Sequence, residues 1–322
     1  MFQYAASKAL AMRRGADLCL DVTSFEGYTL HHGFELKRIF DCPENLASNS
    51  DIRKVLGWRA APLVRRVLSL AGMRLLRGRS LAMEPSFSYW PAYEDAPGEC
   101  YLFGYWQSER YFADVAASIR KDFEFKTQLN SKNDSLARQI RNVNAVSLHV
   151  RRGDYVKNPV TLAKHGVCSP EYYRDAIARI TEEVDAPFFF IFSDDIQWVK
   201  ENVGIEYPCK YIDHNSGADS FNDMRLMSMC RHHIIANSSF SWWGAWLAQS
   251  PRQIVIAPEP WFDDLSIDTR DLLPDRWIKI HKHYRVASGF LELNRSHCNL
   301  PRTEHRTSDK APTQSTSGGL HI

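Results

Sequence analysis

The chain has 322 residues and a net charge of +2 at pH 7, and 44% of its residues are hydrophobic while 24% are charged. This composition is typical of a folded globular protein and excludes a chain that is disordered throughout. The length exceeds the size at which single cores stop growing, so two domains are expected, and the near-neutral charge argues against a nucleic-acid binder.

The first 140 residues are expected to form an N-terminal α/β lobe. Residues 1–15 have a helical pattern that ends at Gly15, a residue type common at helix C-termini. Residues 16–22 predict a strand, and residues 99–112 predict a strand, an aromatic loop and the start of a helix.

Residues 52–83 form a basic segment within this lobe. The segment contains eight lysines and arginines with apolar residues between them and no acidic residue. A basic amphipathic helix can lie on an anionic membrane surface, whereas the same pattern suits the solvated face of an ordinary helical insertion. The sequence leaves both interpretations open, with the insertion favoured over peripheral contact at the inner face of a membrane.

Residues 141–285 are expected to form a C-terminal lobe. The five predicted strands cover residues 145–150, 188–192, 209–213, 232–236 and 253–257, and the four predicted helices cover residues 169–180, 195–203, 221–230 and 239–250. Strands that alternate with helices in this way predict a parallel, doubly wound sheet.

A polar cluster follows each predicted strand of the C-terminal lobe. Ligands bind at the carboxyl ends of strands in an open parallel sheet, so these clusters are expected to converge on one site. The clusters are His149, Arg151, Arg152 and Asp154 after the first strand, Asp194 and Asp195 after the second, residues 213–215 after the third, Asn237, Ser238 and Ser239 after the fourth, and residues 258–261 after the fifth.

The adjacent Arg151 and Arg152 are candidates for phosphate binding, because arginine presents a rigid fork of N–H donors that matches phosphate oxygens. Taken alone, the segment is equally compatible with a surface turn in which Asp154 pairs with an arginine, and its Arg-Gly-Asp tripeptide also resembles a cell-adhesion signal. The polar clusters after the other strands favour a phosphate site.

Residues 237–239 are a second candidate for phosphate binding, since hydroxyl and backbone N–H groups would meet there at the positive end of a helix dipole. A plain N-cap is the alternative for Ser238. The helix that follows carries Trp242, Trp243 and Trp246, for which core packing is favoured over a sugar-binding platform.

Asp194 and Asp195 can cap the following helix, or they can accept hydrogen bonds from a guanine edge or a ribose. No Asp-X-Asp motif occurs in the chain, which argues against a metal-bridged diphosphate and for arginine as the neutralising group. No metal and no cofactor are expected.

Three segments together carry a resemblance to a known family. They are MFQYAASKALA (residues 1–11), HVRRGDY (149–155) and NSSFSWWGAWLA (237–248), and they resemble the family 11 glycosyltransferases, the α-1,2-fucosyltransferases that use GDP-fucose. The resemblance covers residues 1–280. It implies a GT-B-like arrangement of two Rossmann-type lobes and inverting, metal-independent transfer of L-fucose to the 2-hydroxyl of a terminal galactose-like residue on a glycan.

The resemblance also implies catalytic roles. Arg151 would bind the diphosphate and offset charge on the departing GDP, with Arg152 in support, and His149 would face the nucleotide. Asp154 would hold the arginines in place or take the proton of the attacking hydroxyl, and Glu35 is the alternative base.

Further contacts are implied on both sides of the reaction. Asp194 and Asp195 would contact guanine or ribose, and Asn237, Ser238 and Ser239 would contact phosphate. The candidate acceptor contacts are Gln3, Tyr105, Trp106 and Gln107, with hydrophobic core packing as the favoured alternative for the aromatic loop.

The resemblance has one departure. In the family, the segment that aligns with MFQYAA follows a strand and a glycine-rich GLGNQ turn, and this chain begins after both. We therefore expect an N-terminally truncated lobe, with a misassigned start as the favoured explanation. A truncated relative that binds a nucleotide sugar without turnover is the alternative function.

The seven cysteines are scattered without a Cys-X-X-Cys motif, which predicts reduced thiols in a cytoplasmic protein. No apolar run approaches the roughly 18 residues of a membrane span. Residues 286–322 are polar and are expected to form a disordered tail without a function of their own.

Overall fold

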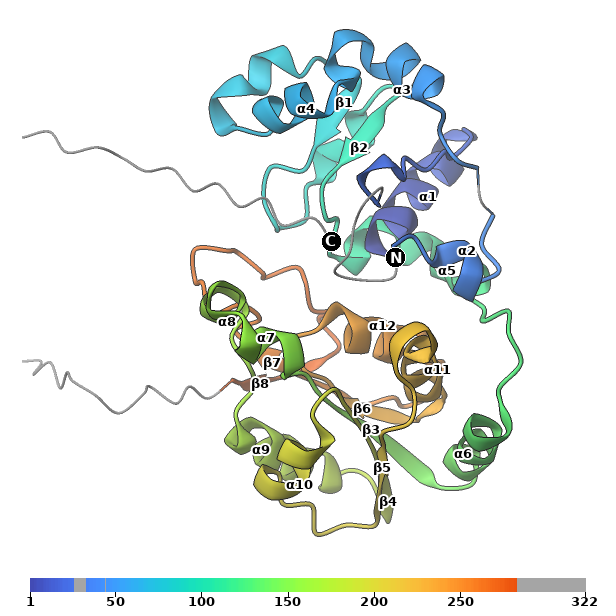
Figure 1. Cartoon of the computed structure of the whole chain (residues 1–322), viewed down its shortest axis with the longest axis vertical. Helices are drawn as coiled ribbons and strands as arrows, with labels where there is room; N and C mark the ends of the chain where they lie inside the picture. The colour runs from blue at the N-terminus through green and yellow to red at the C-terminus, as the bar shows by residue number, and fades with distance from the viewer. Residues whose placement is uncertain (26–32, 44, 283–322) are drawn as a thin grey trace, which may run out of the picture. The chain divides into compact units, whose positions relative to one another are not determined.

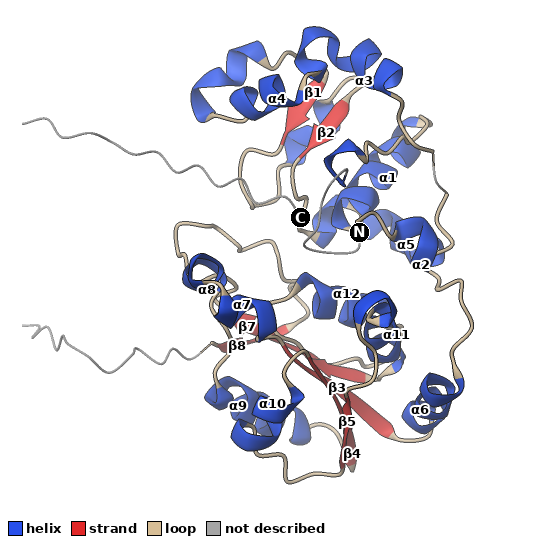
Figure 2. Ribbon diagram, in the orientation of Figure 1, coloured by secondary structure: helices blue, strands red, loops and turns tan. Residues whose placement is uncertain are grey.

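The computed structural model describes residues 1–25, 33–43 and 45–282, so the predicted tail at residues 286–322 lies outside the described residues. The described part contains two parallel sheets, one of six strands and one of two. Figures 1 and 2 show the helices that accompany both. The predicted α/β, GT-B-like fold class is confirmed, although the two-stranded sheet makes the N-terminal lobe much less regular than the C-terminal lobe.

The six-stranded sheet has the order β5-β4-β3-β6-β7-β8, and all its strands are parallel. The chain runs outward from β3 to β5 and then returns to the middle, from where β6 to β8 run outward on the other side. The strands are β3 (Asn144–Val150), β4 (Pro187–Ser193), β5 (Cys209–Ile212), β6 (His232–Ile234), β7 (Val255–Glu259) and β8 (Ile278–His281). All five predicted strands are confirmed, and the topological switch point lies between β3 and β6.

Helices cover both faces of this sheet (Figure 2). Successive side chains of a strand point to opposite faces, so Val146 and Leu148 pack with α9 in one core while Ala145 packs with α6 and α11 in another. The helices of this lobe are α6 (Ser131–Arg141), α7 (Gly153–Lys157), α8 (Pro159–His165), α9 (Pro170–Thr181), α10 (Ile196–Asn202), α11 (Phe221–Met229) and α12 (Ser239–Leu247). Ser169 caps α9, since its hydroxyl accepts a hydrogen bond from the backbone N–H of Tyr172.

The N-terminal part begins with α1 (Phe2–Arg14), which ends at Gly15 with a left-handed φ of 59°, as predicted. The strand predicted for residues 16–22 is wrong. Only Leu20 forms a bridge there, to Leu46, because no neighbouring strand continues the pairing. The short helices α2 (Leu36–Ile39) and α5 (Ala116–Asp122) complete this part together with the parallel pair β1 (Leu81–Met83) and β2 (Tyr101–Phe103).

The basic segment is a series of short helices and not one amphipathic helix. It contains α3 (Asn49–Leu56), a 3-10 helix over Gly57–Ala60, α4 (Pro62–Leu68) and a 3-10 helix over Ala71–Leu76. Gly57 ends α3 with a φ of 59°, and Pro62 occupies the first turn of α4, so the sequence itself divides the segment. None of the described helices is long and apolar enough to cross a membrane.

The predicted core role of the tryptophans in α12 is confirmed. Trp242, Trp243 and Trp246 are all at most 2% exposed. The ring of Phe2 in α1 lies 4.5 Å from that of Trp242 and 4.8 Å from that of Trp243, measured between centroids. One hydrophobic core therefore joins the first helix of the chain to α12.

A half-buried acid, Asp223, lies at the start of α11. The Asp223 carboxylate accepts a hydrogen bond of 2.7 Å from the side-chain amide of Asn215, which also bonds Asn133. Burial raises the pKa of Asp223 from 3.8 to about 7. The folded chain therefore holds this proton at pH values where the unfolded chain has lost it, so the contribution of Asp223 to stability falls as the pH rises from 3.8 to 7.

Asp223→Asn is expected to stabilise the chain above pH 7 by about 1–3 kcal/mol, because the amide keeps the hydrogen bond without a buried charge. Thermal unfolding at acidic and at alkaline pH would measure this. The gain should vanish in acid, where Asp223 is neutral in both states. Asp134→Asn, in the exposed first turn of α6, is the matched control and should show no such gain in alkali. An equal effect of Asp223→Asn at both pH values would contradict the prediction.

Candidate functional site

Three of the five predicted polar clusters, those after β3, β4 and β6, lie at or beside the switch point of the six-stranded sheet. Convergence of all five is wrong, because residues 213–215 follow the edge strand β5, where His214 and Asn215 bond Asn133 of α6. β3 and β6 are direct neighbours, with Leu148 paired to Ile234, so their carboxyl ends emerge side by side. The His149 ring at the end of β3 lies 5.9 Å from the Phe240 ring in the first turn of α12, measured between centroids. The loop after β3 and the start of α12 therefore border the position where open α/β sheets bind their ligands.

Arg151 leaves the end of β3 with a partly exposed side chain. Its guanidinium lies 3.2 Å from a carboxylate oxygen of Asp194, which follows β4, and 5.5 Å from the centre of the Tyr155 ring. The Asp194 carboxylate and the Tyr155 ring both contact the Arg151 guanidinium and restrict its orientation. Arg151 is thus an oriented cation at the switch point, as its predicted role requires.

Arg152 has a different environment. Its guanidinium stacks over the Trp198 ring at 3.8 Å, and its Nε lies 4.0 Å from the Asp195 carboxylate. Burial lowers the pKa of Arg152 below its ordinary value. The side chain packs on α10, so the structure provides a supporting position for Arg152 and leaves Arg151 as the foremost cation.

Asp194 and Asp195 make different contacts, and only the helix capping that the sequence suggested is observed, at Asp195. Asp194 accepts a 2.9 Å hydrogen bond from the backbone N–H of Arg152 in addition to the Arg151 contact. Asp195 caps α10 by accepting from the backbone N–H of Trp198. Gly153 lies so close to Asp194 that an added Cβ would come within 2.7 Å of the carboxylate oxygen, so only glycine fits without a shift. Contact of either aspartate with guanine or ribose stays a prediction.

His149 is buried, with 5% exposure, and burial lowers its pKa to about 3. The imidazole is therefore neutral at physiological pH and cannot offset the charge of a phosphate. Its Nδ1 has no hydrogen-bond partner among the described residues. A catalytic role for His149 would be that of a neutral hydrogen-bonding group facing the nucleotide.

The start of α12 has no side-chain cap. Ser238 occupies the N-cap position, but its hydroxyl makes no capping hydrogen bond, so the plain N-cap interpretation is wrong for this residue. Ser239, the first residue of the helix, is exposed. The backbone N–H groups of the first turn lack a capping side chain at the positive end of the helix dipole, which suits an anion.

Asn237 has an internal role in place of the phosphate contact that the sequence predicts. Its side chain is 1% exposed, and its amide donates to the backbone carbonyls of His165 at 2.8 Å, Trp261 at 3.2 Å and Gly166 at 3.3 Å. The residue ties the end of α8 and the loop after β7 to the start of α12.

A row of rings connects the arginine site to the aromatic loop of the N-terminal part. From Tyr155 each ring centroid lies 5.0–5.3 Å from the next, and no sequence pattern indicates this arrangement because its members are far apart in the chain. The row consists of Tyr155, His165, Phe262, Phe87 and Tyr105. Tyr105, a predicted acceptor contact, is thereby joined to Arg151 through packed side chains.

Glu84 fixes the aromatic loop and was missed by the sequence analysis. Its carboxylate accepts hydrogen bonds from the backbone N–H groups of Tyr105 at 2.7 Å and Trp106 at 3.1 Å, and burial raises its pKa to about 6. The predicted Gln3 donates to the carbonyl of Gly104 in the same loop at 2.8 Å. A single carboxylate at the end of an apolar strand was the only available signal for Glu84.

The remaining predicted residues have varied positions. Trp106 is 1% exposed and packs against Trp90 and Tyr111, so its indole is part of the core and not an acceptor contact. Gln107 in the same loop is half-buried. Glu35, the alternative base, pairs with Arg38.

Asp154 belongs to helix α7, but the structure does not describe its side chain, so its role stays a prediction. Within the described part of the chain, no three histidine, cysteine or carboxylate side chains lie close enough together to hold a metal ion.

The chain is similar to a family model and to several known proteins. The model of the family "Glycosyl transferase family 11" matches residues 86–281. The "Alpha-1,2-colitosyltransferase" of Escherichia coli is 36% identical over 88% of this chain and 95% of its own length, and the "O-antigen biosynthesis glycosyltransferase WbnK" of the same species is 33% identical over 87% and 96%. The solved fucosyltransferase NodZ from Bradyrhizobium aligns with a TM-score of 0.48 and 14% identity over 79% of this chain and 89% of that one.

The family match includes β3, β6 and the start of α12, and therefore every element that borders the switch point. The two relatives from Escherichia coli extend the similarity over nearly the whole described chain. The chain belongs to glycosyl transferase family 11 and is a glycosyltransferase.

Proposed function

We propose that the chain transfers L-fucose from GDP-fucose to the 2-hydroxyl of a terminal galactose-like residue on a glycan, with inversion and without a metal ion. One observation supports this best: Arg151, which follows β3, and the uncapped start of α12, which follows β6, lie on the two sides of the switch point. One offers a guanidinium and the other backbone N–H groups, and a nucleoside diphosphate presents anionic oxygens to both.

In the proposed reaction the acceptor hydroxyl oxygen forms a bond to the anomeric carbon of fucose, while the bond from that carbon to the diphosphate oxygen breaks. The electron pair of the broken bond leaves on GDP, and Arg151 offsets the charge that develops there. The hydroxyl proton passes to a carboxylate, for which Asp154 is proposed and Glu35 is the alternative. Attack from the face opposite the diphosphate inverts the anomeric centre.

The same side chains support the proposed metal independence. Asp194 holds Arg151, and the side chain of the neighbouring Arg152 packs against α10. Two guanidinium groups therefore lie near the proposed diphosphate position. A cation already oriented in the site requires little rearrangement during the reaction. The row of rings from Tyr155 to Tyr105 is the proposed path along which the acceptor glycan approaches Arg151.

A second donor is favoured by one observation. The relative with 36% identity is named for the transfer of colitose, and its name gives the same α-1,2 linkage that is proposed here. Colitose is L-fucose without its 3-hydroxyl. A donor site for fucose and one for colitose can therefore differ in the contact to that hydroxyl alone. The donor is therefore the first variable to test.

The experiment incubates the full chain with GDP-fucose, GDP-colitose or GDP-mannose, each with galactose-terminated acceptors and each in the presence and in the absence of EDTA. Product mass and the linkage determined by NMR are recorded together with GDP release. We expect an α-1,2-fucosylated product that forms equally well with EDTA. Product only from GDP-colitose would replace the donor, product only without EDTA would contradict metal independence, and GDP binding without any product would support the alternative of a relative without turnover.

A further inference from the structure

The basic segment carries an unusual concentration of exposed apolar side chains. Among the described residues, twelve large hydrophobic side chains are exposed, and six of them lie between positions 58 and 76. We call these six the apolar patch: Trp58, Leu63, Val67, Leu70, Leu75 and Leu76. Leu75 is 98% exposed and Leu63 is 77% exposed, so both are fully available to a partner.

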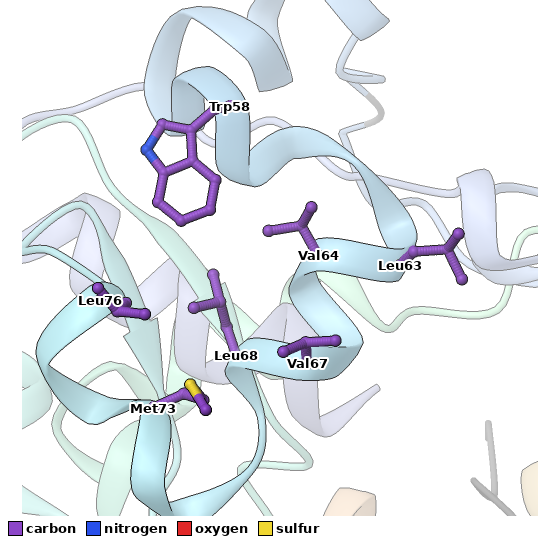
Figure 3. Close-up of a pocket in the computed structure, with 7 residues that line it drawn as sticks. All are labelled: Trp58, Leu63, Val64, Val67, Leu68, Met73 and Leu76. Atoms are coloured by element: carbon purple, nitrogen blue, oxygen red, sulfur yellow. The ribbon is translucent and has the colours of Figure 1, made fainter.

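Four of the six patch residues line one hollow: Trp58, Leu63, Val67 and Leu76. Figure 3 shows side chains from α4 and the flanking 3-10 helices around one hollow. The hollow has a volume of about 280 Å³ and only apolar lining residues, among them Trp58, Val64, Leu68 and Met73. Folded monomers rarely expose a continuous apolar surface of this kind unless it contacts a partner.

Positive charge accompanies the patch. The guanidinium of Arg59 lies 5.1 Å from the centre of the Trp58 ring, and Arg74 and Arg79 are exposed. No acidic residue occurs between positions 52 and 83. Other cations of the segment serve the fold: Arg65 is buried against Asp21, and Arg77 donates to the carbonyls at the end of α4. We call Arg59, Arg74 and Arg79 the arginine rim of the patch.

We propose that the apolar patch and its arginine rim dock the protein on an anionic phospholipid bilayer. An anionic bilayer has negative headgroups directly above an apolar layer, which complements arginines that surround exposed leucines and a tryptophan. Trp58 suits the boundary between the two layers, because its indole is apolar and has one polar N–H group. The docked protein would lie on the surface of the bilayer, which requires no membrane-spanning helix.

The inference does not depend on the proposed transferase reaction, because lipid binding can be measured without donor or acceptor. The full chain is mixed with vesicles of phosphatidylcholine alone or of phosphatidylcholine with phosphatidylglycerol, and bound protein is measured by flotation. We expect binding to the anionic vesicles only, and weaker binding at high salt because salt screens the arginines.

Two double variants separate the contributions of charge and apolar contact. Arg74→Gln with Arg79→Gln is expected to reduce partition into anionic vesicles by about 25-fold, at roughly fivefold per arginine. Leu63→Ser with Leu75→Ser is expected to reduce it by at least about tenfold. Since all four side chains are exposed, thermal unfolding should be unchanged in both variants.

Matched controls come from exposed residues outside the segment. Val160→Ser with Leu265→Ser removes side chains that are 73% and 77% exposed, and Arg141→Gln with Arg252→Gln removes two exposed cations. Both controls should bind vesicles as the original chain does.

Equal binding to neutral vesicles, no binding to either kind, or equal losses in the controls would overturn the proposal. Size-exclusion chromatography covers one further outcome. If the chain is an oligomer that Leu63→Ser with Leu75→Ser dissociates, the patch is an interface between copies of the chain and not a membrane surface.

Discussion

Arg151→Ala is expected to lower kcat/KM for fucosyl transfer by about 10²- to 10³-fold, which is the usual cost of removing one donor that stabilises developing charge. The guanidinium is held between Asp194 and the Tyr155 ring at the end of β3, so it is oriented before substrate arrives. Loss of transition-state stabilisation should appear mainly in kcat, whereas the affinity for GDP should fall less.

Arg151→Lys tests whether charge alone is sufficient. Lysine keeps the positive charge but has no planar fork, so only partial recovery of activity is expected. Arg174→Ala, which removes an exposed arginine paired with Glu171 on α9, is the matched control and should leave kcat/KM unchanged. The proposed role fails if the lysine variant has full activity, or if Arg151→Ala reduces the melting temperature enough to account for the loss of product.

The C-terminal lobe could be predicted from the sequence because its signals are local. Residues 188–192 are a continuous apolar run, and Ser169 with Pro170 marks the start of a helix, so each element is defined within a few positions. The edge strand β8 was not predicted, because Ile278–His281 alternates apolar residues with charged or polar ones over only four positions.

The geometry of the site could be predicted only in part. Arg151 and the start of α12 were located because both follow strands of one parallel sheet, and the fold brings such segments together. The contact of Glu84 with the aromatic loop depends on residues about twenty positions apart, and the side chains of Asn237 and Trp106 point into the protein. No local pattern distinguishes these buried side chains from ligand contacts.

Trp242→Ala is expected to reduce the free energy of unfolding by about 4 kcal/mol, near the upper end for substitutions of buried aromatic residues. The indole is fully buried, its ring centroid lies 5.4 Å from that of Trp277, and its Nε1 donates a 3.0 Å hydrogen bond to the carbonyl of Leu272. The variant leaves a cavity and a buried carbonyl without its donor. Chemical denaturation would measure the loss.

Trp58→Ala is the matched control for this prediction, since Trp58 is 60% exposed and its replacement should change stability by less than about 1 kcal/mol. Because Trp242 also contacts Phe2, the loss should weaken the packing of α1 on α12, and α12 begins at the proposed diphosphate site. We therefore expect the Trp242→Ala variant to bind GDP more weakly, even under conditions where the variant is folded. Equal stabilities of the two tryptophan variants would mean that the core between α1 and α12 does not hold the site in place.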